Sequence, residues 1–112
     1  MFEVEYSELN NYVMKSSEAV ADYHDRLENM TNKDKKYVIE KILSYLDIVL
    51  IFTMNIRHQI ILKLNSAPQS MRIQYNQHLT ELKATMETAK TLSFNFSTIL
   101  NSIRDDIKSD VL

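Results

Sequence analysis

Residues 45–64 read YLDIVLIFTMNIRHQIILKL, and this stretch decides the fold. Twenty residues are enough to cross a bilayer as a helix, and the first half of the stretch is apolar almost without interruption. Asp47, Arg57, His58 and Lys63, however, place charged and polar groups along its length. Moving them into hydrocarbon would cost roughly several kcal/mol in total. We therefore expect the central helix of a helical bundle rather than a membrane span.

The apolar residues in and around this stretch recur alternately three and four positions apart, which is the heptad pattern of packed helices. The positions beside this seam are also largely apolar, so the apolar stripe is wider than elsewhere in the chain. This pattern predicts a helix over about residues 33–65 with neighbours on two sides. Its seam consists of Ile39, Ile42, Leu46, Val49, Thr53, Ile56 and Ile60.

The same spacing continues on both sides of the central helix. Upstream it runs from Tyr6 to Met30, which predicts a helix over about residues 4–30. Thr31 or Asn32 then provides a cap for the central helix.

Downstream, Pro68 ends the central helix, and the spacing from Tyr75 to Ile107 predicts a third helix over about residues 69–109. Residues 92–97 alternate like a strand, but the heptad continues in register on both sides. We therefore expect one continuous helix here; the alternative is a helix that is kinked near residues 92–97.

The composition favours a few long helices. The chain has 112 residues, which gives room for one domain, and it contains no Gly and a single Pro. Hairpin turns and phosphate-binding loops rely on Gly, so neither is expected. The absence of Cys excludes disulfides, thiolate metal sites and cysteine nucleophiles, and it fits a cytoplasmic location.

The net charge is only −2, but it is unevenly distributed. Residues 1–31 carry a net charge of −5 and residues 32–65 a net charge of +3, whereas residues 66–112 are balanced. The first two helices therefore have either complementary faces or ordinary solvated ones. The small overall charge argues against nucleic acid as a partner.

Three helices joined by short connections predict an all-α fold, an antiparallel up-down-up three-helix bundle with coiled-coil-like heptad packing. The third helix is the longest and the first is the shortest, so the bundle has apolar overhangs at both ends. Such overhangs usually mark a contact surface. The candidate partner-binding residues are Ile60, Ile61, Leu64, Met71, Ile73, Tyr75, Ile103, Ile107 and Val111.

No arrangement of residues predicts catalysis. The closest approach to a metal motif is His78-x-x-Glu81, which reverses the usual order in helical bundles and occurs once. No strained turn presents a nucleophile, and the six Tyr and six Met residues are explained by helix packing. We expect no catalytic residue, metal, cofactor or small-molecule substrate.

A non-catalytic interaction module is therefore the leading hypothesis. It would bind a partner helix or a second copy of itself, as an adaptor, scaffold, regulatory subunit or chaperone-like protein. The alternative is a module that binds a membrane surface through the basic middle helix. No motif identifies a family.

Overall fold

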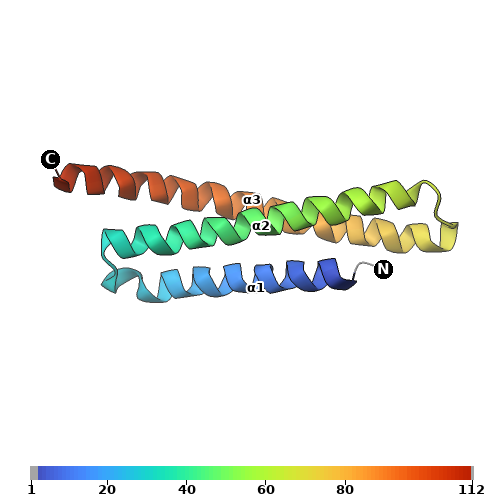
Figure 1. The fold of residues 1–112 in the computed structure, drawn as a ribbon, viewed down its shortest axis with the longest axis horizontal. Coiled ribbons are helices and arrows are strands. Elements are labelled where there is room, and N and C mark those ends of the chain that lie inside the picture. The colour runs from blue at the N-terminus through green and yellow to red at the C-terminus, as the bar shows by residue number, and fades with distance from the viewer. Residues whose placement is uncertain (1–2, 112) are drawn as a thin grey trace.

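The computed structural model describes residues 3–111, and for residues 110 and 111 it describes the backbone alone. Within this range the fold is all-α, as the sequence predicts, and contains no strand. The elements are α1 (Glu3–Arg26), a 3₁₀ turn η1 (Leu27–Asn29), α2 (Asn32–Leu64) and α3 (Gln69–Val111). Figure 1 shows that the chain reverses direction after α1 and again after α2.

The helices differ in length, with 24 residues in α1, 33 in α2 and 43 in α3. The molecule is therefore elongated and measures 64 × 22 × 17 Å. At one end the α2–α3 connection extends beyond the start of α1 (Figure 1). At the other end α3 extends beyond the α1–α2 connection (Figure 1).

The α1–α2 connection shows how a chain without Gly ends a helix. The α-helical part of α1 stops at Arg26, earlier than predicted, and the next three residues tighten into the 3₁₀ turn. No described residue has a positive φ. Thr31, rather than Asn32, caps α2, because its Oγ1 accepts a hydrogen bond from the backbone N–H of Asp34 at 3.2 Å.

The core is one cluster contributed by all three helices. Every seam residue of α2 is buried, whereas α1 buries only Leu9, Ser16 and Tyr23. The buried Ser16 and Thr53 hydroxyls are satisfied within their own helices: Ser16 Oγ donates to the carbonyl oxygen of Val13, and Thr53 Oγ1 donates to that of Val49. The core therefore accepts these polar side chains without an unpaired hydroxyl.

α3 is a single helix through residues 92–97, the segment whose pattern resembled a strand. Packing of Phe96, Leu100 and Ile103 into the core outweighs the low helix propensity of that segment. No helix in residues 3–111 combines the length and apolar character needed to span a bilayer.

Packing is uneven around the molecule. α2 contacts both α1 and α3. Between α1 and α3, one contact is the Tyr6–His78 ring pair, with centroids 5.5 Å apart. A second is the Tyr23–Phe96 edge-to-face pair at 5.6 Å. These two aromatic contacts brace α1 against α3 at separate heights, and a groove lies between them.

Candidate interaction surfaces

One end of the molecule consists of two helices rather than three. Tyr6 lies against His78, and Tyr12 contacts the rings of Tyr45 and Phe52. The first described turn of α1 is thus level with the region just after residue 75 of α3. We call residues 59–64 of α2 and 69–74 of α3, which lie beyond it, the hairpin end (Figure 1).

The hairpin end exposes large hydrophobic side chains from both helices. Three of the predicted residues are among them, and Leu62 was not in the predicted set although it belongs to the same surface. Its place beside Ile61 in an apolar run was the signal that could have found it. The exposed fractions are 39% for Ile61, 63% for Leu62, 37% for Met71 and 65% for Ile73.

Two other predicted residues of this region are not surface residues. Ile60 and Tyr75 are buried in the core cluster, and Leu64 packs against that cluster with partial exposure. The prediction that they are uncovered was wrong because both are seam positions, so α2 and α3 bury them against each other without needing α1.

The predicted overhang at the other end was also wrong for Ile103, which is buried. Its neighbour Arg104 reaches Glu40 of α2, with Nη2 3.3 Å from Oε1. Side chains in a helix lean toward its N-terminus, so Ile103 points back toward the body of the molecule. Ile107 is half-buried against the same cluster, and the side chain of Val111 lies outside the described residues.

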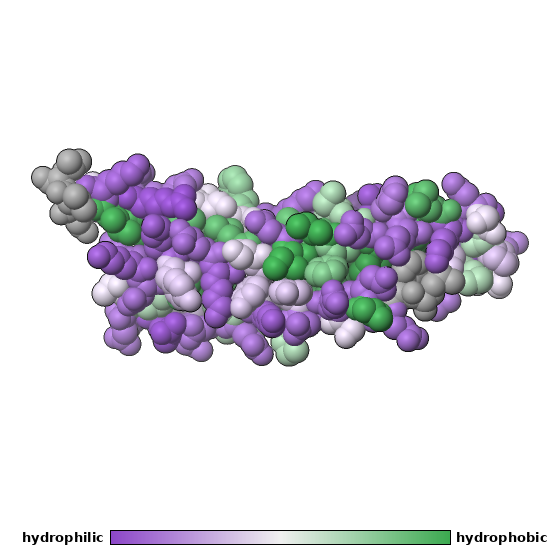
Figure 2. Space-filling model, viewed as in Figure 1, coloured by the Kyte–Doolittle hydropathy of each residue, from purple (hydrophilic) through white to green (hydrophobic). Residues whose placement is uncertain are grey.

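A second exposed hydrophobic surface lies on α2 itself. Ile51 and Met54 are three residues apart and both are exposed. In Figure 2 hydrophobic side chains gather over the middle of the molecule, where α2 lies in front of α3 in Figure 1. The sequence interpretation missed this surface because it assigned the whole wide stripe of α2 to contacts with α1 and α3. The breadth of that stripe was the available signal.

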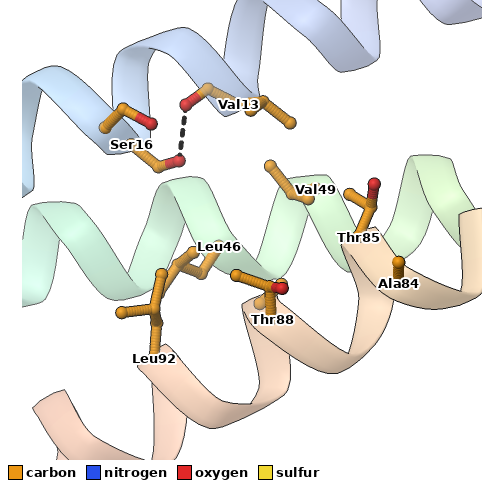
Figure 3. A pocket seen from close by; sticks show the side chains of 10 residues that line it. Val13, Ser16, Leu46, Val49, Ala84, Thr85, Thr88 and Leu92 are labelled. Carbon is orange, nitrogen blue, oxygen red and sulfur yellow. Dashed lines mark hydrogen bonds between the residues drawn. The ribbon is translucent and has the colours of Figure 1, made fainter. Parts of the chain in front are cut away.

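A groove lies between α1 and α3, with its floor on α2. It contains a cavity of about 290 Å³ and an adjoining one of about 240 Å³, which share Ser16, Ser17 and Leu92. Figure 3 shows α2 crossing behind the gap between the other two helices. The groove is lined by Val13, Ser16, Ser17, Val20, Ala21, Leu46, Val49, Ala84, Thr85, Thr88, Ala89 and Leu92.

Small side chains cause this gap. Ser16 on α1 lies across the gap from Ala84 and Thr88 on α3 (Figure 3), and Ser17 lines the same gap. Larger residues at these positions would fill the space, as the ring pairs do above and below it. The sequence interpretation did not predict the groove, since it depends on residue size across two helices that are distant in the chain.

The polar groups near the groove form no reactive constellation. His78 Nδ1 lies 3.9 Å from Glu81 Oε2, and the buried Tyr6 hydroxyl has no hydrogen-bond partner among the described residues. Burial and, to a smaller extent, the charge of Glu81 raise the pKa of Tyr6. Within the described part of the chain, no three side chains of the metal-binding types come together.

No family model matches the chain, and comparison with curated proteins and with solved structures found no match.

Proposed function

We propose that this protein is a non-catalytic helical interaction module that binds a partner helix or a second copy of itself through the hairpin end. The observation that carries the proposal is the exposure of Ile61, Leu62, Met71 and Ile73 on two adjacent helices. Exposed apolar surface of this kind usually marks a protein contact. An adaptor, scaffold, regulatory subunit or chaperone-like role would use such a surface.

The proposal includes an antiparallel three-helix bundle with coiled-coil-like packing. Two features support it: the burial of every seam residue of α2, and the contacts of α2 with both neighbours. In this arrangement the core holds the helices rigid, while the hairpin end offers apolar side chains that no third helix covers. We also propose a cytoplasmic location, which the absence of Cys supports.

The mass in solution, measured by light scattering over a range of concentrations, tests the self-association form. We expect a mass above that of the monomer at high concentration, and Ile73→Asp should return it toward the monomer. Phe94→Asp is the matched control, because Phe94 is also exposed on α3 but lies outside the hairpin end. If the wild-type protein stays a strict monomer throughout, self-association is wrong and a different partner must cover this surface.

Sedimentation with vesicles of anionic lipid separates this proposal from the membrane-surface alternative. We expect the protein to stay in the supernatant, because the bases of α2 are interspersed with Asp34, Glu40 and Asp47. Salt-sensitive sedimentation with the vesicles would favour the membrane alternative instead.

A further inference from the structure

The walls of the groove between α1 and α3 are uncharged. None of the twelve lining residues is charged, although charged residues make up 25% of the chain. The floor is apolar, with Leu46 and Val49 from α2, whereas the exposed residues Ser17 and Thr88 add hydroxyls to the walls. Such a surface accepts an apolar ridge with a few hydrogen-bonding groups beside it.

The basic residues of α3 lie on the flank away from the groove. Lys83, Lys90 and Arg104 are separated by seven or fourteen residues and therefore share one side of the helix. Arg104 contacts Glu40 of α2, which places this side on the flank next to α2. The groove side of α3 carries Glu81 instead, three residues before Ala84.

The charges of α1 are divided in the same way. Lys15 lies over the ring of Tyr12, which contacts α2, and Arg26 is bound by Asp22 in a two-point contact. Beside the groove, Glu18 precedes the lining residue Ala21 by three residues and Asp25 follows it by four. The residues at this spacing beside the groove are thus carboxylates together with His24, which follows Val20 by four residues, whereas Lys15 and Arg26 are engaged elsewhere.

We propose that this groove binds an amphipathic helix of another protein, one with a narrow aliphatic ridge flanked by Lys or Arg. The ridge would fill the cavities over Leu46 and Val49, and the basic flanks would face Glu18 and Asp25 on one side and Glu81 on the other. This site is separate from the hairpin end and does not depend on it.

The shape of the groove favours a helix over a compact ligand. The lining residues of α1 run from Val13 to Ala21, a length of about 12 Å or two helical turns. Small residues on both walls let a third backbone approach closely, as helix-in-groove recognition requires. The Tyr6–His78 and Tyr23–Phe96 ring pairs set the spacing of α1 and α3 on either side of the groove. The groove is therefore present before binding.

The test uses two synthetic helical peptides of about three heptads with the same Ala and Leu ridge. One peptide carries Lys and the other Glu at the flanking positions, and binding is followed by fluorescence anisotropy of a labelled peptide. We expect the Lys peptide to bind roughly tenfold or more tightly than the Glu peptide, with weaker binding as salt rises. No binding of the Lys peptide, or equal binding of both, overturns the proposal.

Groove variants locate the site. Thr88→Arg places a base among the lining residues and should weaken binding of the Lys peptide by about tenfold. Thr98→Arg is the matched control, because Thr98 is also an exposed threonine of α3 but lies about 15 Å farther along the helix. Ser17→Phe fills the groove without adding charge and should also reduce binding.

Circular dichroism of each variant separates a loss of binding from a loss of folding. Ile73→Asp should leave peptide binding unchanged, which keeps this result independent of the hairpin end. Equal effects of Thr88→Arg and Thr98→Arg would overturn the groove as the site. A mass increase that Thr88→Arg abolishes, with no peptide binding, would show that a second copy occupies the groove and would overturn the proposed partner.

Discussion

The three-helix part of the molecule and the hairpin end are built from the same two helices, and only the presence of α1 distinguishes them. In the three-helix part, Tyr12 of α1 covers Tyr45 and Phe52, which lie on the flank of α2. Beyond α1 the seam still buries Ile60, but Ile61 and Leu62 beside it are exposed. A single amphipathic helix thus changes from core element to exposed apolar surface where its neighbour ends.

The largest expected effect comes from shortening an isoleucine in each region. Ile42 and Ile60 are both fully buried in α2. Ile42→Ala should lower the free energy of unfolding by about 2–5 kcal/mol, because α1 and α3 hold α2 on both sides and the structure cannot collapse into the cavity. Ile60→Ala should lower the free energy of unfolding by less, since the two helices at the hairpin end can adjust or open locally. Chemical denaturation measures both values.

Hydrogen exchange adds a control to this pair of variants. With Ile60→Ala, faster exchange should be confined to residues near the α2–α3 connection, whereas Ile42→Ala should speed exchange in all three helices. Equal losses of stability with uniform exchange would show that the hairpin end unfolds together with the rest, and the proposed distinction between the two regions would be wrong.

The cap of α2 provides a smaller effect at the three-helix end. Thr31→Ala removes the acceptor for the Asp34 N–H and should lower the free energy of unfolding by about 1 kcal/mol. Thr31→Ser keeps the hydroxyl and should retain most of the stability that Thr31→Ala loses. The change in the denaturation midpoint tests both variants, and an equal loss in the two would mean that the hydroxyl contributes nothing.

The smallest effect concerns the contact where α1 begins. The pKa of Tyr6 is raised above its ordinary value of 10.0 by burial and then by Glu81. Folded protein therefore holds this proton more tightly than unfolded protein. Its stability contribution is complete below about pH 10 and is lost as the pH rises through the pKa of the folded state.

Replacing Tyr6 with Phe should reduce this alkaline loss. Melting temperatures of Tyr6→Phe and wild type, compared near pH 8 and near pH 11, test the effect. The melting temperature of Tyr6→Phe should fall less between about pH 8 and about pH 11 than that of the wild type. Tyr37→Phe changes an exposed ring and should behave as wild type. Equal drops in melting temperature for Tyr6→Phe and wild type would show that another group causes the loss of stability at high pH.

The all-α fold could be predicted because its signals are local. Heptad spacing and the Thr31 and Pro68 breaks predict three helices whose observed limits differ by only a few residues. Whether one side chain is exposed depends on its neighbours in space. Ile103 was expected at the surface because counting along helix axes ignores the direction in which side chains lean. Tyr75 was expected there because the count ignored that α2 and α3 bury their seam residues without α1.

The candidate surfaces were predictable only in part for the same reason. Ile61 and Ile73 follow from unequal helix lengths, which the sequence contains directly. The groove requires small residues on α1 to lie opposite small residues on α3, about seventy positions later. A single sequence gives the size of Ser17 and Thr88 but does not indicate that they face the same gap.

The position of α2 between its two sequence neighbours also has a consequence for the rate of folding. Most tertiary contacts join helices that are consecutive in the chain. Between α1 and α3, the contacts described above are two pairs of rings and the walls of the groove. Such a topology has a low contact order, for which folding within microseconds to milliseconds is typical. The α2–α3 hairpin can therefore form as one local step, with the docking of α1 as the next.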